Sequence, residues 1–158
     1  MFSQLGIAMV QARTLPAGRI HLDQQQRHFS RGLSVRYSAV QSIKAGHTGA
    51  VVRVDVPLCT PIRGSVVGMT VFTRNERARS SLRFGHSYSD CLWSRFTFAR
   101  PIRVRTDQVF SVSLKSLSGE APLWAASGAQ SNGDPYPRGS GSWAGHVVND
   151  FAFRVYLR

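Results

Sequence analysis

The sequence predicts an all-β fold, an antiparallel β-sandwich of jelly-roll-like type that follows an extended N-terminal arm. Three observations support this prediction. The last nine residues alternate apolar and polar side chains, which is the period of an extended strand. Further short segments with this period follow one another, separated by Gly, Pro, Asn and Ser turn signals. No segment carries the helical period.

Residues 150–158 give the clearest strand pattern in the chain. The segment is rich in aromatic and β-branched residues and follows a Gly/Ser-rich stretch, so we interpret it as the last strand of the sandwich. Its apolar face needs a second sheet to cover it. That face consists of Phe151, Phe153, Val155 and Leu157, and the opposite face of Ala152, Arg154, Tyr156 and Arg158.

One domain is predicted over residues 31–158, because a chain of 158 residues can bury about two-thirds of its unfolded surface in one core. Two stretches lack a strand pattern. Residues 75–81 are interpreted as an exposed basic loop, and residues 128–146 as a long Gly/Ser/Pro-rich loop. The predicted strands cover residues 33–37, 40–43, 52–58, 66–74, 82–84, 93–98, 109–114, 123–127 and 150–158.

Residues 1–30 show no convincing period and contain Pro16, Gly18 and a polar run over 21–28. We expect an extended arm with at most one short strand. Such an arm, where ordered, lies on the protein's own sheet or on a neighbouring subunit. A frayed terminus is the alternative interpretation.

The chain is strongly basic, with 20 Lys and Arg, of which 18 are Arg, against 8 Asp and Glu, and a formal net charge of +12. A skewed base composition of the gene would enrich Arg, but so would selection for an anionic partner. Arg pairs bidentately with carboxylate or phosphate. The candidate partner-binding residues are Arg77, Arg79, Arg103, Arg105 and Arg154.

Rows of arginine on strands can also contact nucleic-acid phosphates. However, the sequence lacks the paired aromatic residues of RNA-binding signatures. Specific binding to nucleic acid is therefore not expected, and an acidic protein surface is the predicted partner.

The two cysteines, Cys59 and Cys91, are too few for a tetrahedral zinc site of their own. They could form one disulfide that closes a loop of about 30 residues and contributes on the order of 3 kcal/mol in the chain-entropy model. Two unpaired, buried thiols are the alternative.

Catalytic motifs are absent from the sequence: there is no Gly-x-Ser-x-Gly and no His-Glu-x-x-His. We expect a protein that is not an enzyme and needs no cofactor, since a hydrolase would require acidic residues that the sequence does not pair. His21, Asp23 and His28 are of metal-ligand type. They lie in the predicted arm, and no metal site is expected there.

Three aromatic residues around the loop at 131–138 suggest a second kind of site. Trp124, Tyr136 and Trp143 could stack on a sugar ring, because exposed aromatic rings offer large rigid contacts. Tyr136 and Trp143 could equally cap the core.

The same loop and the last strand carry oxygen ligands that a structural calcium ion could use. These are Asn132, Asp134 and Asp150. We favour the alternative that Asn132 and Asp134 form two turns with the residues that follow them.

Several segments, in this order, resemble a jelly-roll module common in bacterial surface and secreted proteins: residues 40–49, 93–98, 124, 134–137 and 150–154. The resemblance covers residues 40–158 approximately. It implies a jelly-roll fold and an adhesive or carbohydrate-binding role. Two features differ from that module, the high Arg content and the N-terminal arm. We also expect no attached domain or anchor, and we therefore expect a stand-alone subunit.

No apolar run approaches the roughly 20 residues of a transmembrane helix, so no membrane span is predicted. Residues 1–12 have a short apolar centre but no basic start, which makes a poor signal peptide. We nevertheless expect an extracytoplasmic location, in the periplasm, at the cell surface or on a virion exterior.

The leading functional prediction is a non-catalytic structural subunit. It would dock through its arginines and its N-terminal arm to an acidic neighbour in a larger assembly, such as a cell-envelope complex or a virion shell. The alternative is an extracellular carbohydrate-binding or adhesive module.

Overall fold

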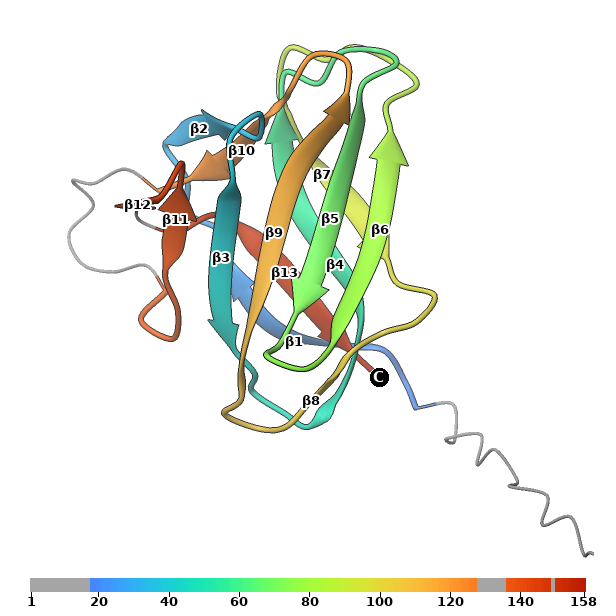
Figure 1. The fold of residues 1–158 in the computed structure, drawn as a ribbon, viewed down its shortest axis with the longest axis vertical. Helices are drawn as coiled ribbons and strands as arrows, with labels where there is room; N and C mark the ends of the chain where they lie inside the picture. Colours follow the sequence, from blue (N-terminus) through green and yellow to red (C-terminus); the bar gives the residue numbers. More distant parts are fainter. Residues whose placement is uncertain (1–17, 128–135, 149) are drawn as a thin grey trace, which may run out of the picture.

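The computed structural model describes residues 18–127, 136–148 and 150–158. In these residues two antiparallel sheets face each other and there is no helix (Figure 1). The predicted all-β sandwich is therefore confirmed. None of the described residues belongs to a helix that could cross a membrane.

The first sheet has seven strands and is built around β4. Strand β13 pairs with one side of β4 and β7 with the other, and β1 pairs with β13 as an edge strand. The strands of this sheet are β1 (His21–Gln26), β2 (Arg31–Ser34), β4 (Gly49–Cys59), β7 (Cys91–Thr97), β8 (Arg103–Val104), β10 (Leu123–Ala126) and β13 (Phe153–Leu157).

The second sheet has six strands in the order β12-β11-β3-β9-β5-β6, so β6 is an edge strand. It lies in front of the first sheet in Figure 1. The chain passes repeatedly from one sheet to the other, as in jelly rolls. The strands are β3 (Ala39–Lys44), β5 (Val66–Phe72), β6 (Arg77–Arg83), β9 (Val109–Ser118), β11 (Gly141–Trp143) and β12 (His146–Val148).

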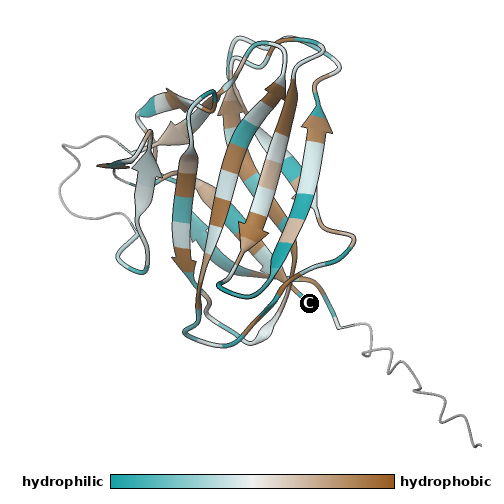
Figure 2. Cartoon of the chain, in the orientation of Figure 1, coloured by the Kyte–Doolittle hydropathy of each residue, from teal (hydrophilic) through white to brown (hydrophobic). Residues whose placement is uncertain are grey.

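The core lies between the sheets and contains the predicted apolar face of the last strand. Phe151, Phe153, Val155 and Leu157 are all 0% exposed. Arg154 and Tyr156 are only half-buried, as their place on the opposite face requires. Figure 2 shows the same alternation along the strands of the second sheet, where apolar and polar bands follow one another. Sequence period and burial therefore agree along β13, whereas Ala152, which precedes this strand, is buried although its period places it on the opposite face.

Two segments predicted to be loops contain strands. Residues 77–83 form β6, in which Ala78 faces the core while Arg77 and Arg79 face solvent. The strand pattern is weak because two of the three inward residues of this edge strand, Ala78 and Ser80, are small, and only Leu82 is a large apolar residue. Within the predicted loop over 128–146, β11 and β12 pair as a hairpin, whereas residues 128–135 lie outside the described residues.

The predicted arm over residues 1–30 overlaps the first sheet. Strand β1 pairs with β13, so the described part of the arm lies on the protein's own sheet, and the sandwich begins ahead of residue 31. Its pairing register shifts between Leu22 and Gln24, which makes Asp23 the extra residue of a β-bulge. Residues 1–17 lie outside the described residues.

Candidate functional site

Three arginines from two distant segments line one open hollow on the surface. Arg77 and Arg79 project from β6 on either side of the inward-facing Ala78. The segment between β7 and β8 passes beside them and contributes Ala99 and Arg100. Two of the predicted partner-binding residues thus lie together with an arginine that the sequence did not single out.

Glu76 holds the two segments together. Its Oε2 accepts a hydrogen bond of 2.9 Å from the backbone N–H of Arg103. The backbone N–H of Glu76 in turn donates to Oγ1 of Thr73, at 3.0 Å. The β5–β6 turn is therefore tied to the start of β8, and the exposed Arg103 side chain lies next to the segment that supplies Arg100.

The three arginines of this hollow form no ion pair within the described part of the chain. Arg77, Arg79 and Arg100 are exposed, and no carboxylate within residues 18–127, 136–148 and 150–158 forms an ion pair with any of them. The strands of the second sheet contain no Asp or Glu. Three planar guanidinium groups in this arrangement suit carboxylate or phosphate groups.

The outer face of the first sheet differs, because its arginines have internal partners. Asp55 is buried, and its carboxylate accepts a hydrogen bond of 2.8 Å from Nε of Arg53. Nε of Arg95 lies 3.6 Å from the same carboxylate. The hydrogen bond to Asp55 raises the pKa of Arg53, although burial opposes this. The guanidinium of Arg53 also stacks on Tyr156, 4.1 Å from the ring centroid.

Arg154 belongs to this internally partnered face and not to the hollow. Its guanidinium carbon lies 3.9 Å from the ring centroid of Trp93, and the side chain is half-buried. That Arg154 also contacts a partner stays a prediction. Arg105 is exposed but does not line the hollow. It lies just beyond β8, where its backbone N–H donates to Oε1 of Gln108 at 2.9 Å.

Of the predicted sugar-stacking residues, Trp124 and Tyr136 are buried and Trp143 is half-buried, which agrees with the alternative that Tyr136 and Trp143 cap the core. Trp124 is 0% exposed and stacks on Phe151 with 4.2 Å between ring centroids. Tyr136 is buried edge-on against Phe153. Trp143 is half-buried, and its indole N–H donates to the backbone O of Ser34 at 2.9 Å. The faces of Trp124 and Tyr136 cannot reach a ligand unless the core opens.

Tyr136 is held at the edge of the core by its hydroxyl group. This group donates to Oε1 of Gln24 at 3.2 Å and contacts the backbone O of Lys44 at 3.4 Å. Burial raises the pKa of Tyr136 to about 12, because ionisation would place a charge among apolar groups.

Asp150, a predicted calcium ligand, is buried and bonds to protein groups. Its Oδ1 accepts from Nε2 of Gln41 at 2.8 Å, and its Oδ2 accepts from the backbone N–H of Tyr136 at 3.1 Å. The carboxylate thus anchors the segment that precedes the last strand. The other two predicted ligands, Asn132 and Asp134, lie outside the described residues.

Cys59 and Cys91 pair directly across β4 and β7 and form a disulfide. The bond spans 32 residues of sequence, a stretch that includes β5 and β6. It therefore links two neighbouring strands of the first sheet and closes the loop that contains β5 and β6.

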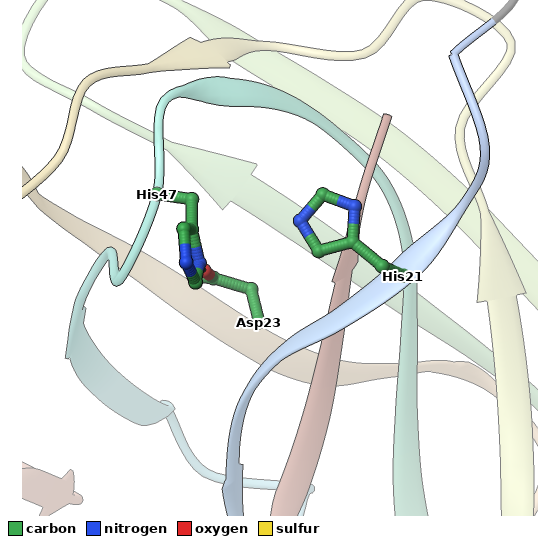
Figure 3. Close-up of side chains that lie close together, drawn as sticks. All are labelled: His21, Asp23 and His47. Atoms are coloured by element: carbon green, nitrogen blue, oxygen red, sulfur yellow. The ribbon is translucent and has the colours of Figure 1, made fainter.

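A second cluster joins β1 to the turn between β3 and β4. One ligand atom each of His21, Asp23 and His47 lies within 4.8 Å of the others. Figure 3 shows the three side chains converging, with the Asp23 carboxylate against the His47 ring and the His21 ring facing both. The sequence had grouped His21 and Asp23 with His28, but His28 is not part of this cluster.

The two residues that sequence reasoning missed, Arg100 and His47, lie in loops. Arg100 precedes Pro101, which favours an extended, exposed backbone. His47 lies in the glycine-rich turn at 45–49. Nothing local indicates that Arg100 meets β6 or that His47 meets β1, because both contacts depend on how the strands are ordered in the sheets.

The sequence matches no protein-family model, and no curated protein matches it.

Proposed function

We propose that the protein is a non-catalytic interaction subunit that docks an acidic protein surface through Arg77, Arg79 and Arg100. The observation that carries this proposal is the convergence of three exposed arginines on one hollow, without an ion-pair partner among the described residues. Arg103, held beside them by Glu76, extends the cationic surface.

The chemistry of the hollow is compatible with carboxylates of an acidic protein surface, which is the partner that we propose. A guanidinium binds a carboxylate through two parallel hydrogen bonds, so clustered arginines select an acidic patch of matching geometry. The net charge of +12 adds long-range steering toward a negatively charged partner. The edge strand β6 also offers unpaired backbone groups beside the hollow.

The proposed setting is an extracytoplasmic assembly, such as a cell-envelope complex or a virion shell. The Cys59–Cys91 disulfide supports this setting, because disulfides persist mainly in oxidising compartments.

The test measures binding of a fluorescein-labelled glutamate-rich peptide by fluorescence anisotropy at low and moderate salt. The variant R77E/R79E/R100E is compared with R27E/R31E/R36E, which changes the net charge equally at three other exposed arginines. We expect the first variant to weaken binding by at least about tenfold, because it loses the direct contacts of the hollow as well as long-range electrostatic attraction. The second variant loses only the long-range attraction and should weaken binding much less.

Equal losses in the two variants would show that only net charge matters and would contradict the proposal. A DNA oligonucleotide with the same number of negative charges serves as the competing ligand. If the DNA binds more tightly than the peptide and R77E/R79E/R100E abolishes that binding, the hollow is a nucleic-acid site and the proposed partner class is wrong.

A further inference from the structure

We infer that His21, Asp23 and His47 form a binding site for one divalent transition-metal ion of the zinc type. The inference concerns a different part of the molecule from the arginine hollow and does not depend on it. The site lies between the edge strand β1 and the turn at 45–49 that precedes β4 (Figure 3).

The spacing of the donor atoms suits such an ion. Nδ1 of His47 lies 2.8 Å from Oδ1 of Asp23, and the three ligand atoms lie within 4.8 Å of one another. Zinc bonds of about 2.0–2.2 Å to nitrogen and oxygen place tetrahedral ligands about 3.5 Å apart. Both imidazoles are exposed, so a small side-chain rotation closes the set without disturbing the core.

Asp23 is fixed in place before any ion arrives. Its side chain is 0% exposed, and its Oδ2 accepts a hydrogen bond of 2.9 Å from the backbone N–H of Gly46. The β-bulge in β1 occurs at this residue, and bulges commonly redirect a side chain near functional sites. One carboxylate oxygen is therefore held by the turn while the other faces the imidazoles, which is how outer contacts orient metal ligands.

Gly46 is required for this arrangement. A Cβ atom at this position would lie 2.9 Å from Oδ1 of Asp23 and 2.4 Å from Nε2 of Gln24. Any other residue would push the carboxylate or the amide away from the turn. The close approach of the turn to β1 therefore depends on a residue without a side chain.

The donor set indicates which ions fit. Two imidazoles with one carboxylate suit zinc, copper, nickel or iron, whereas calcium and magnesium prefer oxygen ligands. Three protein ligands leave at least one coordination position, and the His47 side chain is 70% exposed, so water can occupy it. The net charge of +12 opposes cation binding, which makes the buried Asp23 carboxylate the essential ligand.

The test is calorimetric titration of ZnCl2 into the full chain, prepared without a polyhistidine tag and stripped with chelator. One zinc ion per chain is expected, and His21→Ala, His47→Ala and Asp23→Asn should each weaken binding by at least about tenfold. His28→Ala is the matched control, because His28 is an exposed histidine near β1 that is not part of the cluster. It should bind zinc as the native chain does.

Two further measurements keep the result interpretable. Circular dichroism establishes that each variant is folded, and His21→Ala removes only an exposed side chain. Imidazole NMR signals of His21 and His47 should shift on zinc addition while those of His86 and His146 do not. No zinc binding by the native chain, or an equal loss in His28→Ala and His21→Ala, overturns the inference.

Discussion

The guanidinium of Arg154 stacks on the ring of Trp93 across the intervening strand β4, with 3.9 Å between the guanidinium carbon and the ring centroid. Together with Arg53 on Tyr156, this contact shows that Arg53 and Arg154 pack against aromatic rings of their own sheet. The arginines around β6 have no such partners among the described residues. The two groups of arginines therefore differ in their contacts within the protein.

The Arg154–Trp93 contact should contribute to stability and not to docking. A double-mutant cycle with Arg154→Ala and Trp93→Ala is expected to give a coupling free energy of about 0.5–1 kcal/mol in urea unfolding. Arg154→Ala should leave binding of the glutamate-rich peptide unchanged. A peptide-binding loss as large as that of Arg79→Ala would assign Arg154 to the docking surface after all.

Removing the charge of Asp55 should destabilise the fold, because Arg53 and Arg95 then lose their shared partner. Asp55→Asn is expected to lower the free energy of unfolding by about 2 kcal/mol, the usual range for hydrogen bonds to charged groups. Asp107→Asn is the control, since the Asp107 side chain is 69% exposed and its ion pairs are at the surface. Chemical denaturation measures the unfolding free energy of both variants. An equal loss in Asp55→Asn and Asp107→Asn would contradict the structural role of Asp55.

Burial of Tyr136 should make stability fall at high pH. Its pKa is about 12 in the folded protein and about 10 in an unfolded chain. Folding therefore favours the neutral phenol, so the contribution is complete below about pH 10 and is lost as the pH rises toward 12. Urea unfolding at about pH 9 and pH 11.5 measures the loss, which should be smaller in Tyr136→Phe than in the native protein.

Absorbance of the ionised phenol gives an independent check. The native protein should show a late ionisation step toward pH 12, and this step should disappear in Tyr136→Phe. If the native protein shows no such step while it remains folded, Tyr136 is not buried as described.

Loss of the Cys59–Cys91 disulfide should weaken the link between β4 and β7. The bond spans 32 residues, and the chain-entropy model assigns a loop of this length about 3 kcal/mol. Cys59→Ser/Cys91→Ser should lower the unfolding free energy, extrapolated to zero urea, by roughly that amount. A double variant as stable as the oxidised native chain would contradict this contribution.

Much of the fold follows from periodicity. The alternation in residues 150–158 is strong enough to predict both the strand and its buried face, because aromatic and aliphatic residues occupy every second position. The pattern fails at β6, where Ala78 is the only fully apolar residue that is buried. An edge strand needs few inward apolar residues, so its sequence looks like a charged loop.

The sites are less predictable, because they depend on contacts between distant segments. Arg77 and Arg79 could be selected from their spacing, but Arg100 joins them only through the packing of the β7–β8 segment on β6. Likewise His47 meets Asp23 only because β1 joins the first sheet. Trp124 was assigned to a surface, although an aromatic residue in a short strand is as readily explained by the core.

The most direct test of the docking proposal is NMR observation of the arginine Nε–Hε signals during titration with the glutamate-rich peptide. The signals of Arg77, Arg79 and Arg100 should shift together and saturate at one peptide per chain, while those of Arg53 and Arg154 stay in place. Small, unsaturated shifts spread over all exposed arginines, with none concentrated at the hollow, would contradict it.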